Sequence, residues 1–465
     1  METRQIAAIV LIVVVVAGVG VGIWLFLPTA PEPPYGELVI GQLVTPGAPA
    51  GVSDDYIIRV GILGPVTEIQ GEGHWRGAYM ACDEINTAGG VTIGGDAYYF
   101  GLIAEDTFEA DPNLDTSKGI AAAQKILTDD NAQFIIGGFR TEAVVAYQEN
   151  IMSAKKLFLS CGVATDLFTT NLNESYDTYK YFFRITPINS SALGAEIIGF
   201  LGALRPTMEY ALGKNVSQVA IIREDLAWTE PISAALNYYL PILGYNKTIE
   251  IPYPITAQAT DFATYWQQID ATGAQITIPV ISAQGGILLT TQYAALEPKC
   301  LIAGIDVESQ ESTYWNETGG ACEHEVIIQT MHRTNKTTKS IDMWDNFISH
   351  YGEEPLYTAV GTYDAMYVLR RGINDAQSLN STTIIPYLEA VTTADPVEAA
   401  GGNIAFTKWH DVIEGYDGDT IYSVGLFCQW QADGAKKVIT TQGAVYPNWL
   451  ATGPITFPSW GIHDE

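Results

Sequence analysis

Short apolar runs alternate with stretches of helical periodicity along most of this 465-residue chain. The first run, Ile57–Leu63, is followed by a helical stretch at Gly73–Thr87. Continuous apolar runs of this length are typical of parallel strands, because helices cover both faces of a parallel sheet. Parallel strands joined through helices form right-handed crossovers. The alternation therefore predicts an α/β protein with doubly wound parallel sheets.

The alternation occurs in two successive series, which predict two α/β lobes. A further short apolar run at Leu38–Gly41 is an additional strand candidate. The other expected strands are Tyr98–Ala104, Phe134–Ile136, Leu157–Leu159, Gln218–Ile222, Thr248–Pro252, Gln275–Ile281, Cys300–Gly304 and Val326–Gln329. The other expected helices are Ser117–Thr128, Glu142–Ser153, Ala192–Leu204, Pro231–Leu243, Asp261–Thr272 and Gly286–Leu296.

One segment before the alternation is a candidate transmembrane helix. Ile6–Leu27 contains 22 residues without a charge, and at about 1.5 Å per residue it would span roughly 33 Å, the thickness of a bilayer core. Arg4 precedes it and the next cationic residue is Arg59. The positive-inside rule then predicts a cytoplasmic N-terminus and an extracytoplasmic main domain. A cleaved signal peptide is the alternative, but its apolar region is normally shorter.

The regions around this segment complete the predicted localisation, a single-pass protein of the cell membrane. Residues 1–5 are expected to lie in the cytoplasm, residues 6–27 in the membrane, and the Pro/Gly-rich residues 28–55 in a stalk. Seven Asn-x-Ser/Thr sequons follow the membrane segment, which fits a glycosylated exterior. Their acceptor residues are Asn173, Asn189, Asn215, Asn246, Asn316, Asn335 and Asn380.

Composition excludes some classes of partner and scaffold. The chain has 23 Lys and Arg against 53 Asp and Glu, a formal net charge of −30, so nucleic acid would be repelled. The five cysteines have no zinc-type spacing and are too few for a disulfide scaffold. Cys300 and Cys322 bracket a loop, and for them a disulfide and two buried thiols both remain open.

Motifs for catalysis, cofactors and metals are missing from the sequence. It contains no P-loop, HExxH, GxSxG or EF-hand motif. His324 stands between Glu323 and Glu325, a pattern more typical of a solvated acidic loop than of a metal site. We therefore expect no enzymatic activity, no cofactor and no metal.

Three loops follow expected strands at the edge where parallel sheets bind ligands. They are Thr67–Gly73, Gly137–Thr141 and Ser160–Thr165. Their small, hydroxyl-rich composition leaves backbone amides free for an anionic or zwitterionic solute.

Seven segments, in a fixed order, carry a family resemblance. They are VGILGPVTEIQGEGHWRGAYMACDEINTAGGV (Val60–Val91), EDTFEADP (Glu105–Pro112), IIGGFRTEAV, LSCGVATD, YFFRITP (Tyr181–Pro187), TYDAMYVL (Thr362–Leu369) and GGNIAFTKWHDV (Gly401–Val412). From Ile57 to about Pro447 the chain resembles the branched-chain amino-acid-binding type (type 1) of periplasmic binding protein, the leucine-binding-like solute receptors of ABC transporters.

This resemblance implies two lobes joined by three crossovers that close around a solute. Residues 56–187 and 332–402 would form lobe 1, and residues 188–331 and 403–442 lobe 2. Residues 443–465 would form a C-terminal tail.

The family's ligand contacts fall on residues of both lobes. The resemblance assigns them to Gln70, Thr141, Ala164 and Thr165 in lobe 1 and to Trp228, Gln284 and Asp306 in lobe 2. Arg140 stands beside Thr141 and is either a bidentate carboxylate ligand or an exposed first-turn arginine. For Trp228 a purely structural role in the core is the alternative, and for Thr141 and Thr165 it is helix capping.

Two departures from the family pattern affect the expected ligand. The position of Gln70 is commonly aromatic in amino-acid binders, and Gln284 cannot neutralise an ammonium. Either Asp306 substitutes for the missing acid or the ligand carries no amine there.

Together, the membrane segment and the resemblance predict a membrane-tethered, extracytoplasmic binding protein of an ABC importer. Its expected ligand is an amino acid or a similar small polar solute, and its expected partner is an ABC permease in the same membrane. A sensory or structural cell-surface glycoprotein with the same fold is the alternative. A third hypothesis, a membrane-anchored hydrolase, would need a set of catalytic residues, and the sequence shows none.

Overall fold

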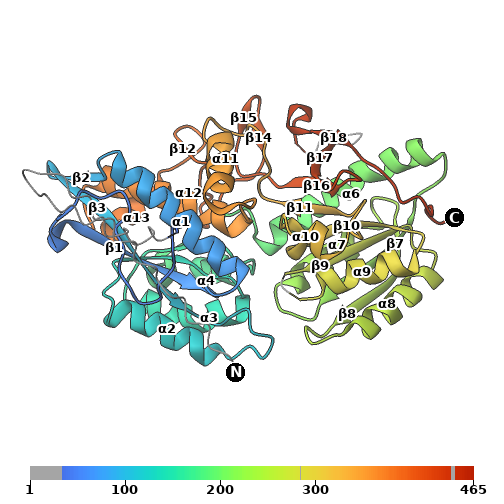
Figure 1. Ribbon diagram of the computed structural model, residues 1–465, viewed down its shortest axis with the longest axis horizontal. Coiled ribbons are helices and arrows are strands. Elements are labelled where there is room, and N and C mark those ends of the chain that lie inside the picture. Colours follow the sequence, from blue (N-terminus) through green and yellow to red (C-terminus); the bar gives the residue numbers. More distant parts are fainter. Residues whose placement is uncertain (1–33, 283, 441–445, 465) are drawn as a thin grey trace, which may run out of the picture. The chain divides into compact units, whose positions relative to one another are not determined.

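The alternating pattern folds into two sheets, each flanked by helices (Figure 1). The computed structural model describes residues 34–282, 284–440 and 446–464. Both sheets lie in one unit that begins at Leu38. The candidate membrane segment, Ile6–Leu27, lies outside the described residues. Within the described part of the chain, no helix combines the length and the apolar character needed to cross a bilayer.

Lobe 1 contains a six-stranded sheet in the order β2-β3-β1-β4-β5-β6. All neighbours are parallel except β2 and β3. The strands are β1 (Ile57–Gly64), β2 (Val91–Ile93), β3 (Asp96–Asp106), β4 (Phe134–Gly137), β5 (Phe158–Ser160) and β6 (Phe182–Arg184). The helices are α1 (Ile69–Thr87), α2 (Thr116–Thr128), α3 (Thr141–Ser153), α4 (Leu167–Glu174), α5 (Tyr176–Tyr179), α11 (Ser340–Tyr351), α12 (Tyr357–Ala376) and α13 (Ser381–Glu389).

Lobe 2 contains an eight-stranded sheet in the order β18-β17-β16-β11-β10-β9-β7-β8. Strands β7 to β11 run parallel to one another, and β16 runs antiparallel to both β11 and β17. The strands are β7 (Gln218–Glu224), β8 (Asn246–Tyr253), β9 (Ile276–Ile281), β10 (Leu301–Asp306), β11 (Val326–Gln329), β16 (Leu426–Trp430), β17 (Lys436–Thr440) and β18 (Gly453–Pro454). The helices are α6 (Ser190–Leu212), α7 (Thr229–Tyr239), α8 (Ala259–Ala271), α9 (Gly286–Leu296) and α10 (Tyr314–Glu317).

Alternate residues of β7 show why this sheet is covered on both sides. Val219 and Ile221 pack in the core that contains residues of α6 and α7. Ala220 and Ile222 pack in a second core with residues of α8 and α9. Because successive side chains of a strand point to opposite faces, a strand apolar at every position needs a layer of helices on each side.

The chain passes between the lobes three times, as expected of the type 1 fold. The first passage follows β6, the second follows β11, and the third lies near two short two-stranded ribbons. These ribbons are β12–β13 (Val397–Glu398, Asn403–Ile404) and β14–β15 (Tyr416–Asp417, Thr420–Ile421).

A buried lysine holds two of these passages together. The Lys336 ammonium donates to the carbonyl oxygens of Thr330, Gly401 and Val424. Its acceptors therefore come from segments far apart in the sequence. Since all three N–H donors are used, Lys336 ties backbone to backbone rather than neutralising a carboxylate at contact distance.

Residues 38–55 pack against lobe 1, so the predicted stalk is wrong for this part of the chain. The Gly41 amide donates to the Ala104 carbonyl at 2.9 Å, and Val44 forms an isolated bridge with Leu102. Strand β2 pairs with only three residues of β3. Beyond these three residues, the backbone groups on the same edge of β3 can pair with another segment, and the Pro/Gly-rich segment pairs with them. Leu38–Gly41 forms no strand.

The end of the chain is part of lobe 2 rather than a tail. Strand β18 extends the sheet beside β17, and Leu450 and Ile462 lie buried in the lobe 2 core. The His463 amide donates to the Lys299 carbonyl at 2.8 Å. The described residues 446–464 therefore belong to the folded domain.

All five cysteines are buried free thiols, so the Cys300–Cys322 disulfide is wrong and the buried-thiol interpretation is confirmed. Cys300 lies beside Thr277, with 3.3 Å between Sγ and Oγ1. Cys322 packs in a separate cluster with Tyr314 and Trp430. Burial raises the pKa of each thiol to about 12, which keeps both protonated.

Six of the seven sequon asparagines are exposed, and Asn189 is the exception. The Asn189 side-chain oxygen caps α6 by accepting from the Ser191 and Ala192 amides, and its nitrogen donates to Asp411 at 3.0 Å. A glycan on that nitrogen would interrupt the contact to Asp411. Asn189 is therefore unsuited to the predicted modification.

Buried carboxyls predict that the unliganded protein is more stable in mild acid. A group whose pKa is raised by folding stabilises the fold at low pH, and this stabilisation is lost as the pH rises through the folded pKa. We expect a higher melting temperature at about pH 5.5 than at about pH 8, measured by differential scanning calorimetry. Burial raises the pKa of Glu109, Glu196, Glu308, Glu325 and Asp364 to about 7 and that of Glu311 to about 8.

Two buried histidines act in the opposite direction but over a lower pH range. Burial lowers the pKa of His74 to about 3 and that of His332 to about 4. Their contribution is gained as the pH rises and is essentially complete near the ordinary histidine pKa of about 6.5. A melting temperature that rises between pH 6.5 and 8 would contradict the prediction.

Candidate functional site

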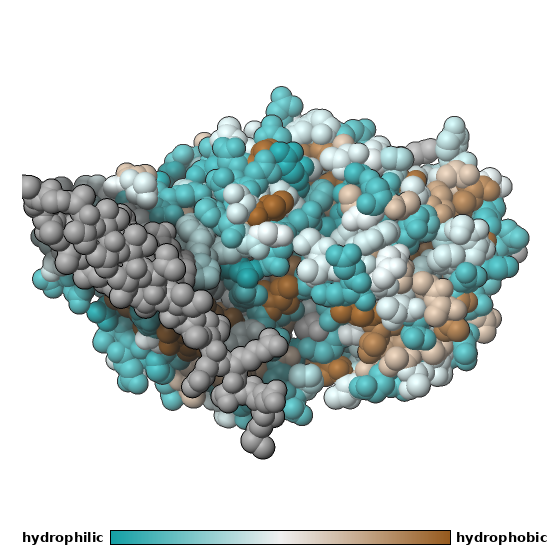
Figure 2. All heavy atoms as spheres, in the orientation of Figure 1, coloured by the Kyte–Doolittle hydropathy of each residue, from teal (hydrophilic) through white to brown (hydrophobic). Residues whose placement is uncertain are grey.

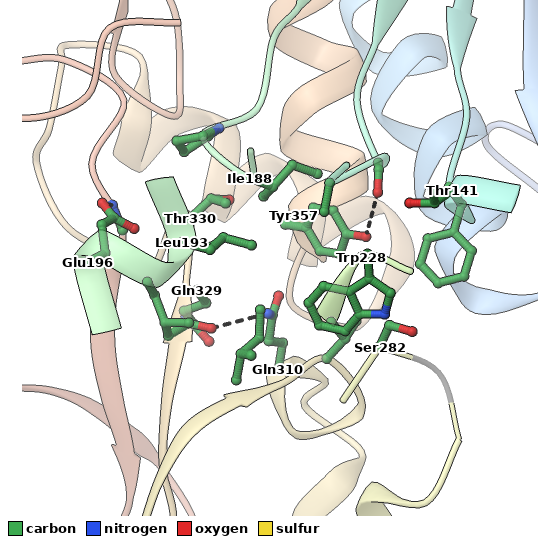
Figure 3. Close-up of a pocket in the computed structure, with 18 of the residues that line it drawn as sticks. Thr141, Ile188, Leu193, Glu196, Trp228, Ser282, Gln310, Gln329, Thr330 and Tyr357 are labelled. Atoms are coloured by element: carbon green, nitrogen blue, oxygen red, sulfur yellow. Dashed lines mark hydrogen bonds between the residues drawn. The ribbon is translucent and has the colours of Figure 1, made fainter. Parts of the chain in front are cut away.

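Loops and strand ends of both lobes enclose a pocket (Figure 3). Lobe 1 contributes Thr141 at the start of α3, Gly162 and Ala164 after β5, and Tyr357 at the start of α12. Lobe 2 contributes residues of α6, the loops after β7 and β9, and the ends of β10 and β11. The expectation that ligand loops meet at the carboxyl ends of the strands is confirmed for this pocket.

A tight turn brings α3 to the pocket. Gly137 has a φ of +124°, and a Cβ there would lie 2.0 Å from the Leu63 carbonyl oxygen. A side chain at this position would therefore push β4 away from β1. Beyond the turn, Thr141 is only 3% exposed and stands in the first turn of α3. Backbone amides of a first turn have no carbonyl partner within the helix, so they are available to an anionic group.

The guanidinium of Arg140 connects the two lobes. Its Nη1 donates to the Asp111 carbonyl at 3.2 Å, and its Nη2 donates to Gln284 Oε1 of lobe 2 at 2.7 Å. The residue is 3% exposed. The alternative of an exposed first-turn arginine is therefore wrong, whereas the role as a carboxylate ligand stays a prediction, since Arg140 lines the pocket.

A buried carboxylate organises the lobe 2 wall. Glu224, at the end of β7, accepts from the Trp228 indole at 3.2 Å, the Ser282 hydroxyl at 2.6 Å and the Gln284 amide at 3.3 Å. Trp228 is 5% exposed and borders both the pocket and the lobe 2 core. Its core role and its pocket role are therefore compatible.

Two predicted residues lie in a neighbouring hollow rather than in the pocket. Gln70 and Gln284 border this hollow, with Glu68, Asp111 and other acidic side chains around it. Gln284 donates to the Ala110 carbonyl at 3.1 Å, besides accepting from Arg140. Gln284 is thus an inter-lobe contact, and Gln70 stands apart from the pocket that contains Thr141.

Two other predicted residues have structural roles. Asp306 is fully buried, and its Oδ2 accepts from the Tyr314 hydroxyl at 3.3 Å. Its neighbours Ile305 and Val307 line the pocket, so strand alternation turns Asp306 away from it. Burial, with Glu325 and Glu308 nearby, raises the pKa of Asp306 well above its ordinary value. Thr165 accepts from the Leu167 amide at 3.3 Å, which fits the capping alternative.

Several pocket residues were not predicted. Gln329 and Thr330 stand at the end of β11, where the strand-end rule would have pointed to them. Gln310 donates to the Ile328 carbonyl at 3.2 Å, and Tyr357 donates to the Gly162 carbonyl at 3.3 Å. Glu196 lies inside α6, and no local sequence signal distinguishes it from a surface glutamate.

The residues described by the structure offer no metal centre: they contain no group of three His, Cys, Asp or Glu side chains placed to hold an ion. His324 contacts Thr456, with 2.8 Å between Nδ1 and Oγ1. Glu325 instead accepts from Thr290 at 2.8 Å. Glu323 Oε1 lies 3.5 Å from His324 Nε2, but Glu325 points to Thr290, so the two glutamates do not converge on the histidine.

Removing Gln284 should favour an open conformation. Gln284→Ala deletes two inter-lobe hydrogen bonds, each contributing about 0.5–1.5 kcal/mol. We expect a larger radius of gyration of the unliganded protein in small-angle X-ray scattering and an affinity about three- to tenfold weaker.

The matched control is Gln431→Ala, which removes a glutamine whose hydrogen bonds stay within lobe 2. It should change neither quantity. Equal scattering profiles for the two variants would contradict a latch role for Gln284.

Comparison with known proteins agrees with this architecture. Residues 57–417 match the model of a family described as periplasmic binding protein. Leu/Ile/Val-binding protein homolog 7 of Brucella melitensis is 22% identical over 436 residues, which cover 90% of this chain and 98% of that relative. Leu/Ile/Val-binding protein homolog 8 of Brucella abortus is 20% identical over 416 residues, covering 86% and 93%.

Solved structures share the fold at low identity. The leucine-binding protein LivK of Thermotoga maritima has a TM-score of 0.66 at 15% identity, covering 84% of this chain and 99% of its own. An ABC-transporter solute-binding protein of R. palustris, solved with benzoate, has a TM-score of 0.66 at 14% identity, covering 85% and 97%. The chain belongs to the periplasmic binding protein family and has its type 1 fold.

Proposed function

We propose that this protein is the membrane-tethered, extracytoplasmic binding protein of an ABC importer. In this proposal it captures an amino acid or a similar small polar solute that carries a carboxylate. The observation that supports it most is the pocket between the lobes, with apolar walls and an end formed by Thr141 and the first turn of α3. Such an end suits a carboxylate, which accepts hydrogen bonds from hydroxyl and amide donors.

The known ligands of similar proteins support a carboxylate. Solved structures of ABC-transporter binding proteins contain leucine in a Desulfitobacterium hafniense protein, isoleucine in LivJ of Streptococcus pneumoniae, and benzoate in the R. palustris protein. These three ligands share a carboxylate and an apolar body. The pocket suits both parts of such a ligand, because Thr141 offers a hydroxyl to a carboxylate and Ile188, Leu193 and Ile305 are apolar lining residues.

A ligand screen tests the capture of solutes. The full chain, purified in mild detergent, is heated with each common amino acid and with short carboxylic acids. A ligand at a hundredfold excess over its Kd stabilises the folded state by about 2.7 kcal/mol, which raises the melting temperature. If no amino acid or carboxylate changes the melting temperature, the proposal fails and a surface glycoprotein without a solute becomes the better hypothesis.

Cell fractionation tests the tether separately. The proposed anchor rests on the uncharged segment Ile6–Leu27 and the cationic residue before it. The full chain should remain in the membrane fraction after an alkaline carbonate wash, and a variant lacking residues 1–37 should be released. Equal release of both would contradict the anchor and leave solute binding unaffected. Co-purification with a permease would test the proposed partner.

A further inference from the structure

The far end of the pocket indicates a second charged group on the ligand. We infer that the ligand carries a primary ammonium at the end opposite its carboxylate, as an ω-amino acid does. This inference rests on the proposed capture of a carboxylate-bearing solute. It concerns the end of the pocket formed by Glu196, Gln329 and Thr330, which we call the acceptor end.

Three buried oxygens of the acceptor end have no hydrogen-bond partner among the described residues. They are Glu196 Oε2, Gln329 Oε1 and Thr330 Oγ1. Gln329 is 4% exposed and Thr330 is 7% exposed. Burying acceptors without donors is costly, and such sites are usually completed by a partner. Figure 3 shows these side chains at one end of the pocket and Thr141 and Ser282 at the other, with Leu193 and Tyr357 between them.

The surrounding contacts fix which atoms remain available. The Gly425 amide donates to Glu196 Oε1 at 2.7 Å, so Oε2 is the oxygen left over. Gln329 Nε2 donates to the Met331 carbonyl at 2.7 Å, which orients its amide oxygen away from that contact. The nearby cation cannot replace a ligand, because the Lys336 ammonium already donates to three carbonyls.

The chemistry of the acceptor end matches an ammonium. A primary ammonium has three N–H donors and no acceptor. The acceptor end has three buried oxygens that receive no hydrogen bond from the described residues. Burial raises the pKa of Glu196 to about 7, as expected for a carboxyl that lacks a cation at contact distance. Burial and the nearby Glu196 raise the pKa of Glu414, so this second carboxyl close to the acceptor end favours its protonated form.

Two buried acids near the opposite end already accept hydrogen bonds from the protein. Glu224 is occupied by Trp228, Ser282 and the Gln284 amide. Glu109 accepts from the Thr107 hydroxyl at 2.9 Å and from the Arg140 amide at 3.0 Å. Glu142 keeps one buried oxygen without a partner among the described residues, but its side chain does not line the pocket. An amine beside the carboxylate would therefore compete with the donors that occupy Glu224 and Glu109, whereas an amine at the acceptor end would meet oxygens without donors.

Matched pairs of ligands test this inference on the full chain by isothermal titration calorimetry. Each pair has one chain length, with and without the terminal amine: 4-aminobutanoate with butanoate, 5-aminopentanoate with pentanoate, and 6-aminohexanoate with hexanoate. We expect at least one amine to bind about tenfold or more tightly than its partner, because a desolvated charge pair forms only with the amine.

A substitution identifies the residue responsible. Glu196→Gln keeps the acceptor for the Gly425 amide but removes the charge, so it should abolish the preference for the amine. The matched control is Glu209→Gln on the same helix, whose side chain pairs with Arg205 at 2.9 Å outside the pocket. It should leave the preference unchanged.

The outcomes separate the inference from the proposed function. If carboxylates bind but no amine gains affinity over its partner, the inference is overturned and solute capture stands. The same holds if α-amino acids such as leucine bind and every ω-amino acid fails. If no carboxylate of any kind binds, the proposed function fails and this inference fails with it.

Discussion

Replacing Arg184 by methionine should lower the free energy of unfolding by about 3–5 kcal/mol, because the substitution leaves buried partners of a charge unpaired. Arg184 is fully buried at the end of β6, where the chain leaves lobe 1. Its Nη2 donates to the Thr165 carbonyl at 2.6 Å, and its Nε lies 3.4 Å from Asp411 Oδ1. The side chain thus holds the Ser160–Thr165 loop against a crossover segment.

Most of the lost free energy of unfolding would come from Asp411, the carboxylate that pairs with Arg184. It also accepts from Asn189, and burial raises its pKa while Arg184 opposes that rise. Without the guanidinium, a half-buried carboxylate would keep only a neutral amide as its partner. Urea unfolding, followed by circular dichroism, should show a lower midpoint with an unchanged slope.

The matched control exchanges an arginine that is also paired with an aspartate, but on the surface. Arg333 donates to both carboxylate oxygens of Asp345 at 2.7 Å, and both side chains are about half exposed. Arg333→Met should cost about 1 kcal/mol or less, because solvent screens an exposed pair. If Arg184→Met costs no more than this control, the crossover contact does not hold the fold together.

The strands were predictable because their signal is local. Ile57–Leu63 was expected and β1 is Ile57–Gly64; Val326–Gln329 was expected and β11 has the same bounds. A strand buried on both faces must be apolar at nearly every position, and few other elements share that pattern. Hydrophobic burial thus determines these elements directly from the sequence.

Helix α6 shows where local rules fail. The sequence predicted a helix at Ala192–Leu204, and Pro206 just beyond it is a residue that normally ends a helix. The helix instead runs from Ser190 through Pro206 to Leu212 and ends at Gly213, which has a φ of +66°. Met208, beyond the proline, is buried in the lobe 2 core. Tertiary burial of the last turns therefore outweighs the hydrogen bond that the proline removes, and no sequence window contains that information.

The site was predictable only in part, for a related reason. Residues that follow strand ends directly, such as Thr141, Ala164 and Trp228, do line the pocket. The prediction that Asp306 contacts the ligand missed the pocket lining by one position. Side chains alternate along the chain here, and Ile305 and Val307 line the pocket instead. Glu196 was not found because its place in the pocket depends on how α6 packs beside β11 and Gly425, which is a property of the assembled lobes.

Replacing Trp228 by alanine should weaken ligand binding by about 2–4 kcal/mol, which is roughly 30- to 1,000-fold in Kd. The indole ring covers part of the lobe 2 wall, and its nitrogen donates to Glu224. Removing it opens the wall to water and takes one donor from a fully buried carboxylate. Because Glu224 also accepts from Ser282 and from the Gln284 amide, the rest of the wall should lose its fixed geometry.

Calorimetric titration of the best ligand from the screen measures this effect. Trp228→Phe should bind more tightly than Trp228→Ala, since it keeps an aromatic wall and loses only the indole donor. Trp449→Ala is the control for removing a tryptophan, because that side chain is 51% exposed and outside the pocket. If Trp228→Ala binds within threefold of the unmodified protein, Trp228 is only a core aromatic, and the ligand lies elsewhere than between the two lobes.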